Sequence, residues 1–118
     1  FYQVGCAGHP PMLHRLSNGI VQAVDAEGMI LGFHNEAIYE ETEGVLADNE
    51  SLLLYTDGIL ESQNRQQEMF GQKRLETLLS KADMDSDRIL NRVEHALFHW
   101  SQGRQSDDCT MLSIVRSA

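Results

Sequence analysis

The segment LLLYTDG, residues 52–58, decides the fold class because it joins an apolar run to an acidic turn. Polar residues bound the run on both sides, and this pattern predicts a strand that is buried on both faces of a sheet. Asp57 follows the run directly, and Gly58 leaves the backbone free to turn sharply after it. The segment therefore predicts a central strand that presents a carboxylate at the edge of a core.

Antiparallel hairpins are predicted on the amino-terminal side of this strand. Asn18-Gly19 takes the positive φ values of a tight turn, so the flanking segments are expected to pair. A strand that begins at residue 1 has to stop at Gly8, because two prolines follow His9 and cannot continue a ladder. The strands are expected at residues 1–7, 12–15, 20–24 and 38–42.

Two helices and a last strand are predicted on the carboxyl-terminal side. Leucines at helical spacing indicate a helix over residues 72–82, and Ser86 is the expected N-cap of a second helix that ends near Gly103. Residues 109–115 alternate as a strand with apolar residues on both sides, so it is expected to be buried on both faces. The order predicts an α+β fold, a layered sandwich in which helices pack on an antiparallel sheet.

Composition bounds the class of protein. A chain of 118 residues with 42% hydrophobic content is expected to form one domain with one core. The net charge of -9 disfavours nucleic acid and anionic membranes as partners, and the apolar runs are too short for a membrane span. Cys6 and Cys109 form no disulfide framework and no CxxC pair, which fits reduced thiols in a cytoplasmic protein.

Two acidic strand ends are the candidates for chemistry. Asp57 can reach a metal or a substrate, although an Asp-Gly dipeptide is also a common turn. Asp107 and Asp108 precede the last strand, where adjacent carboxylates repel unless solvent or a cation separates them. Together the two ends would make an oxygen-rich site for a hard divalent cation, and the alternative is a pair of solvated turns.

The other polar residues indicate less. His9 precedes two prolines and is expected to have a structural role. The spacing of His95 and His99 would suit a metal, but no HExxH motif surrounds them, and they are expected to decorate a helix face. No GxSxG elbow, GxGxxG fingerprint or P-loop is present.

Three motifs in order resemble a known family. They are AGHPP at residues 7–11, LLLYTDGILES at residues 52–62 and DDCTML at residues 107–112. Phe70-Gly71 and Arg74-Leu75 fit the same order. In these residues the chain resembles the stage II sporulation protein E type (RsbU-like) of the PPM, or type 2C, metal-dependent serine/threonine protein phosphatases, over essentially its whole length.

The resemblance implies a fold and a reaction. It implies part of an αββα sandwich with antiparallel sheets packed by helices, holding two Mn²⁺ or Mg²⁺ ions whose bridging water attacks phosphoserine or phosphothreonine. By motif position, Asp57 and Asp107 are implied metal ligands. Asp108 is implied as a second-shell residue or alternative ligand, and Gly58 as backbone near the metal site.

The chain also departs from the family pattern. The first Asp-Gly motif, whose aspartate bridges both metals, belongs before residue 7, so residues 1–118 are expected to be the C-terminal portion of the phosphatase domain and inactive as an isolated fragment. Asn49-Glu50 stands where Gly-Asp is usual, and a changed turn is expected there.

The resemblance also implies partners. It implies a phosphorylated regulatory protein as substrate, such as an anti-sigma factor antagonist of the STAS type, and an upstream sensory or receiver domain. The alternatives are a pseudophosphatase that binds the same partner without turnover, and a plain α+β domain whose acids only form turns.

Overall fold

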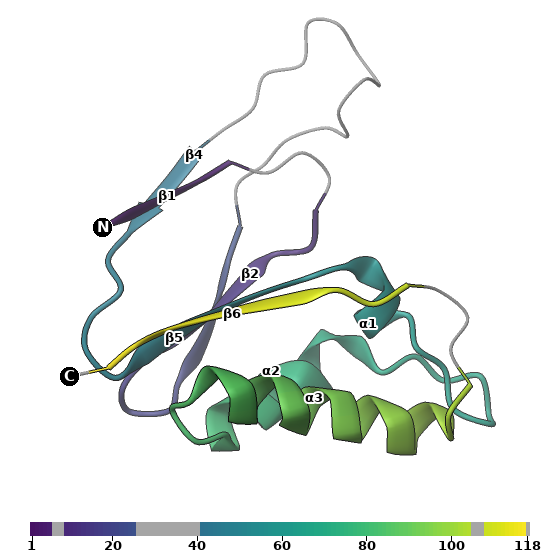
Figure 1. The fold of residues 1–118 in the computed structure, drawn as a ribbon. Helices are drawn as coiled ribbons and strands as arrows, with labels where there is room; N and C mark the ends of the chain where they lie inside the picture. The colour runs from purple at the N-terminus through teal and green to yellow at the C-terminus, as the bar shows by residue number, and fades with distance from the viewer. Residues whose placement is uncertain (6–8, 26–40, 105–107, 118) are drawn as a thin grey trace, which may run out of the picture.

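Figure 1 shows a computed structural model that describes residues 1–5, 9–25, 41–104 and 108–117. The elements in chain order are β1 (Tyr2–Gly5), β2 (Met12–Arg15), β3 (Val21–Val24), β4 (Glu41–Gly44), β5 (Glu50–Tyr55), α1 (Asp57–Leu60), α2 (Gly71–Lys81), α3 (Ser86–Ser101) and β6 (Met111–Arg116). An antiparallel sheet has the strand order β3-β2-β5-β6, and β1 pairs with β4 in a second, two-stranded sheet. Helices α2 and α3 lie along one side of the larger sheet, and the β1–β4 pair lies away from them (Figure 1). The predicted α+β class is confirmed.

Strand β5 is the central strand that the apolar run predicted. It pairs with β2, where Leu53 lies opposite Leu13, and with β6, where Tyr55 lies opposite Met111. The strand begins earlier than predicted, at Glu50, and ends at Tyr55, so that Thr56 becomes the N-cap of α1.

The core lies between the sheet and the two long helices. Because side chains alternate along a strand, Leu53 and Tyr55 share one face of β5, and both are 1% exposed or less. The helices contribute their apolar stripes to the same cluster, which includes Leu75, Leu79, Ile89 and Val93. The predicted helix boundaries are within about two residues of the observed ones at every end.

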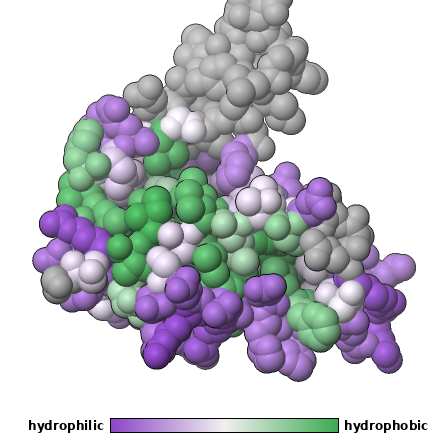
Figure 2. All heavy atoms as spheres, in the orientation of Figure 1, coloured by the Kyte–Doolittle hydropathy of each residue, from purple (hydrophilic) through white to green (hydrophobic). Residues whose placement is uncertain are grey.

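The prediction that the last strand is buried on both faces is wrong. Met111 and Val115 pack against the core, but Leu112 and Ile114 on the other side are 56% and 42% exposed. Helix α3 covers β6 from one side only, and the apolar pattern cannot show whether an element covers the second side. Figure 2 shows hydrophobic residues gathered in a band at the level of the sheet, above the polar surface of the helices.

The N-cap prediction for α3 is also wrong by one residue. Asp85 is the N-cap, and its side chain accepts a hydrogen bond from the Arg88 amide at 3.0 Å. Ser86 is the first helical residue, and its hydroxyl lies 3.4 Å from the Ser113 carbonyl oxygen. Both Asp and Ser can cap a helix, and Asp85 does so here because its backbone has the extended conformation of an N-cap residue.

The structure also describes the two turns that the sequence singled out. The hairpin at Asn18-Gly19 is confirmed, with φ of +90° at Gly19 and antiparallel pairing of β2 with β3. Asn49 adopts φ of 60° in the turn before β5, and that this turn differs from the one usual in the family stays a prediction. Strand β4 begins at Glu41, whereas the prediction began at residue 38; residues 38–40 lie outside the described part of the chain.

Within the described ranges, no helix has the length and apolarity that crossing a lipid bilayer requires. Cys109 is not in a disulfide bond, and Cys6 lies outside the described residues.

Candidate functional site

Asp57 is placed by the end of β5 and by a short helix anchored in the core. Thr56 has extended backbone with φ of -95° and ψ of 162°, and α1 begins at the next residue. Ile59 is 0% exposed and belongs to the core cluster, which fixes the helix against the sheet. The Asp57 side chain is exposed, so the carboxylate faces solvent from a buried support.

The start of β6 is joined to the same place by two hydrogen bonds between Thr56 and Thr110. The Thr56 amide donates to the Thr110 carbonyl oxygen at 3.0 Å. In the reverse direction the Thr110 amide donates to Thr56 Oγ1, also at 3.0 Å. The Thr56 hydroxyl therefore ties the two chain segments together and does not cap α1.

Gly58 lets the two segments approach even more closely. A Cβ at this position would overlap the carbonyl oxygen of Asp108 and lie 3.4 Å from Cys109 Sγ. The φ of Gly58 is not in the left-handed region. The glycine therefore supplies space for the close approach, whereas the sequence had suggested a sharp turn. Any larger residue at position 58 would push the two segments apart.

The structure thus brings together part of the set that the sequence singled out. Asp57 and Asp108 lie on adjacent segments at one end of the β5–β6 pair, and both side chains are exposed. Asp107 lies outside the described residues. Among the described residues no group of three or more His, Cys, Asp or Glu side chains could hold a metal. A complete metal site needs ligands beyond Asp57 and Asp108.

Tyr55 lies directly beneath this end of the sheet and is 1% exposed. Burial, with the negative charges of Glu76, Asp57 and Asp25, raises the pKa of Tyr55 to about 12. Its hydroxyl has no hydrogen-bond partner among the described residues. The phenol therefore stays protonated at neutral pH and adds no charge beneath Asp57.

The loop from α1 to α2 is held by contacts of Trp100 and Arg74. Trp100 Nε1 donates to the Ser62 carbonyl at 2.9 Å, and the Arg74 guanidinium lies 4.2 Å from the centre of the Trp100 ring. Arg74 also donates to the Phe70 carbonyl at 2.9 Å. These contacts fix the chain that leaves α1 and so support the position of Asp57.

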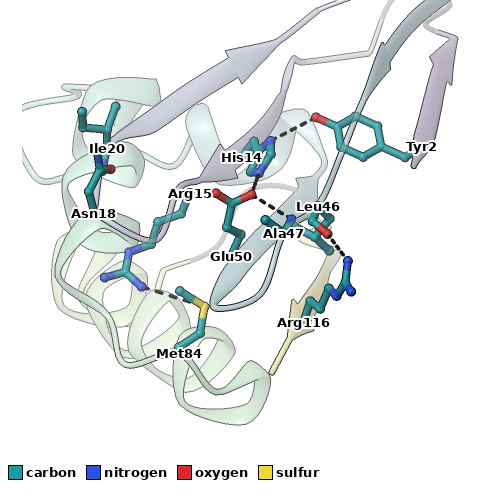
Figure 3. A network of polar contacts seen from close by, with 10 residues as sticks. All are labelled: Tyr2, His14, Arg15, Asn18, Ile20, Leu46, Ala47, Glu50, Met84 and Arg116. Atoms are coloured by element: carbon teal, nitrogen blue, oxygen red, sulfur yellow. Dashed lines mark hydrogen bonds and ion pairs between the residues drawn. The ribbon is translucent and has the colours of Figure 1, made fainter. Parts of the chain in front are cut away.

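A second acidic residue, Glu50, sits at the opposite end of β5 and is bonded within the protein. Figure 3 shows a chain of contacts from Tyr2 through His14 to Glu50. The Tyr2 hydroxyl lies 3.0 Å from His14 Nδ1, and His14 Nε2 lies 2.9 Å from Glu50 Oε1. Glu50 Oε1 also accepts a hydrogen bond from the Ala47 amide at 3.0 Å. That amide and His14 lower the pKa of Glu50, although burial opposes them. Burial and the Glu50 charge raise the pKa of Tyr2.

His9 has a local contact, because its Nδ1 lies 2.8 Å from the Pro10 carbonyl oxygen. The sequence did not identify the Glu50 network, since its three side chains come from segments far apart in the chain. The only local signal was the unusual Asn49-Glu50 pair.

Comparison with solved structures identifies the fold as that of type 2C phosphatase domains. The manganese-soaked phosphatase domain of the cell fate determinant SpoIIE from Bacillus subtilis superposes with a TM-score of 0.76 at 19% identity, over 98% of this chain and 50% of that one. The structure of the RsbU and RsbW domains of a Mycobacterium tuberculosis protein gives a TM-score of 0.72 at 25% identity, over 98% of this chain and 34% of that one.

The sequence shows the family itself. The family model described as Stage II sporulation protein E (SpoIIE) matches residues 2–117, and the chain belongs to this family. Protein IcfG of Synechocystis sp. is 28% identical over 112 residues, which are 94% of this chain and 18% of that protein. The chain therefore spans half or less of the length of these relatives.

Proposed function

We propose that the protein carrying this chain is a metal-dependent phosphatase, a hydrolase that removes phosphate from phosphoserine or phosphothreonine on a regulatory protein. In this proposal residues 1–118 form the C-terminal portion of its phosphatase domain and contribute one wall of the site. The observation that carries the proposal is the close approach of Gly58 to the Asp108 carbonyl, which gathers the acidic segments at one end of β5–β6.

The residues at this end fit Mn²⁺ or Mg²⁺ in donor chemistry. Carboxylate oxygens are the ligands that hard divalent cations prefer, and Asp57 stands exposed on a rigid support. Asp57 and Asp107 would be the ligands from this chain, with Asp108 as a second-shell residue or alternative ligand. The remaining ligands of a two-ion site would come from outside the described residues. A bound cation supplies Lewis-acid chemistry by acidifying water and stabilising charge on phosphoryl oxygens.

The rest of the described site would hold the carboxylates in place. Thr56 and Thr110 fix the spacing of the two segments, and the Gly58 backbone permits it. Tyr55 below them stays neutral, so the site gains no competing phenolate. A preorganised pair of carboxylates costs little reorganisation when a cation binds.

The substrate class rests on the family alone. We propose a phosphorylated protein as partner, of which a STAS-type anti-sigma factor antagonist is the leading candidate, and an upstream sensory or receiver domain in the same cytoplasmic protein. The RsbU-type domain of the Mycobacterium tuberculosis structure shares this chain's fold and stands in one structure with an RsbW domain, which supports a place in such signalling.

The test is manganese-dependent hydrolysis of p-nitrophenyl phosphate by the intact protein. Asp57→Asn should reduce the rate by at least about a hundredfold, because a ligand is lost where charge develops. Asp48→Asn is the matched control: Asp48 is an exposed acid near the other end of β5, and this variant should retain the wild-type rate.

Equal rates for the wild type and Asp57→Asn would contradict the catalytic assignment. If the intact protein hydrolyses nothing in Mn²⁺ or Mg²⁺ but binds the phosphorylated partner, the pseudophosphatase alternative is supported instead.

A further inference from the structure

Helix α3 carries two exposed histidines whose ring nitrogens face each other. His95 and His99 are four residues apart, so they lie one turn apart on the same side of the helix. Their Nε2 atoms are 3.1 Å apart, and the ring centroids are 4.5 Å apart. This separation is that of a hydrogen bond in which one Nε2 carries the proton and the other accepts it. When that ring carries its proton on Nδ1 instead, both Nε2 atoms are acceptors that lie side by side and can bind one cation.

The separation matches two neighbouring positions in the coordination sphere of a metal. If each Nε2 lies about 2.05 Å from an ion, two nitrogens 3.1 Å apart subtend an angle of about 98° at that ion. This value lies between the 90° of square-planar or octahedral ions and the tetrahedral angle of about 109°. We propose that His95 and His99 form a binding site for a transition-metal ion such as Zn²⁺, Ni²⁺ or Cu²⁺.

The chemistry of the site distinguishes it from the acidic end of β5–β6. Imidazole nitrogen suits zinc, nickel and copper, whereas carboxylate oxygen suits magnesium and manganese. The two sites should therefore have different metal preferences. The proposal about His95 and His99 does not rest on the proposed phosphatase function.

The position along the helix also favours a cation. His99 lies in the last turn of α3, which ends at Ser101, where the partial negative charge of the helix carboxyl end attracts positive ions. The His99 ring makes T-shaped contacts with the His95 ring and with the Phe98 ring, whose centroids are 4.5 Å and 6.4 Å from its own. A preorganised chelate loses less side-chain entropy on binding.

The proposed site has two protein ligands. No third His, Cys, Asp or Glu of the described residues joins the pair, so water would fill the other positions. Such a site exchanges its metal readily, and its open positions can accept a donor group from another molecule. The expected stoichiometry is one ion per chain.

The test is calorimetric titration of the intact protein with zinc chloride, in magnesium at a concentration that saturates the hard-cation site. Wild type should bind one Zn²⁺, and this binding should be lost in His95→Ala and in His99→Ala, since each removes one of the two protein ligands. His9→Ala is the matched control, because His9 is an exposed histidine outside the helix and its loss should leave the affinity unchanged. Circular dichroism should show that all three variants keep the wild-type fold.

The outcomes separate this proposal from the phosphatase proposal. Zinc binding that survives in both single histidine variants, or that disappears in Asp57→Asn, would overturn the histidine site. Manganese-dependent hydrolysis should be the same in His99→Ala as in wild type. Failure of hydrolysis in the wild type would leave the zinc result unaffected.

Discussion

Strand β5 begins with an acidic residue, and another acidic residue follows its last residue by two positions. The first is buried and bonded within the protein, whereas the second is exposed. Glu50 is 8% exposed and bonded to His14 and the Ala47 amide. Asp57 is exposed at the first residue of α1, with the Asp108 segment drawn close beside it.

The difference teaches how position separates a carboxylate that is bonded within the protein from one that is open to a ligand. Hydrogen bonds within the protein already occupy the Glu50 carboxylate, so this carboxylate is not available to a ligand. Asp57 stands on a fixed backbone and faces solvent, where a cation can reach it. The changes below are expected to affect one end and spare the other, and their effects decrease in order.

Gly58→Ala should have the largest effect, and at the Asp57 end only. The new Cβ would overlap the Asp108 carbonyl oxygen, so the two segments must separate. We expect a loss of about 1–3 kcal/mol of stability, and roughly a hundredfold loss of manganese-dependent hydrolysis if the proposed function is correct. Urea unfolding and the hydrolysis assay measure the two effects.

Gly5→Ala is the control for this change. A Cβ at Gly5 meets no atom of the described residues within 4 Å, so stability and activity should be those of wild type. A Gly58→Ala protein with unchanged stability would show that the close approach to Asp108 is not maintained in solution.

Glu50→Gln should come next, and it acts at the other end. Hydrogen bonds to a charged group are worth about 1.5–3 kcal/mol, so the variant should lose about 2 kcal/mol at neutral pH, whereas Asp57→Asn should change stability by less than about 0.5 kcal/mol. Urea unfolding of both variants measures the contrast. A larger loss in Asp57→Asn would reverse the comparison.

The pH dependence of Glu50→Gln follows from the lowered pKa of Glu50. Because the folded protein holds this pKa below its ordinary value of 4.5, the stabilisation is complete above about pH 4.5 and is lost as the pH falls through the folded value. The stability difference between wild type and Glu50→Gln should therefore shrink in acid. A difference that stays constant from about pH 7 to about pH 3 would contradict a stabilising, ionised Glu50 carboxylate.

Local patterns predicted the parts of this contrast that depend on neighbours in sequence. The apolar run located β5, and the Asp-Gly after it located Asp57 at the strand end. Helical spacing located α2 and α3. These signals work because strand and helix periodicity depend on a few consecutive residues.

The parts that depend on distant contacts could not be predicted. The Glu50–His14 bond joins residues 36 positions apart, and the Thr56–Thr110 bond joins residues 54 apart. The exposure of Leu112 was missed for a related reason, since an apolar pattern does not reveal which face another element covers. The role of Asp107 as a metal ligand stays a prediction.

Thr56→Val should have a smaller effect at the Asp57 end. The change removes the oxygen that accepts from the Thr110 amide but keeps the shape of the side chain and the backbone bond between the two residues. The expected cost is about 1 kcal/mol, because Thr110 is exposed and water can replace the lost acceptor. Amide hydrogen exchange at Thr110 should accelerate.

Thr77→Val on α2 is a matched control for this loss. Its hydroxyl donates to the Lys73 carbonyl within an exposed helix, so its removal should cost less than about 0.5 kcal/mol. Equal costs for the two variants would mean that Thr56 gives no special support to the Asp108 segment.

Arg116→Ala should have the smallest effect, although Arg116 makes two contacts near the Glu50 end. Its guanidinium lies 2.9 Å from Asp48 and donates to the Leu46 carbonyl at 2.9 Å, but the two charged side chains are 56% and 58% exposed. Water screens exposed pairs, so the cost should stay below about 1 kcal/mol and fall further in high salt. Urea unfolding at low and high salt measures this. A loss as large as that of Glu50→Gln would show that the surface pair, and not the buried Glu50–His14 bond, holds this end of β5.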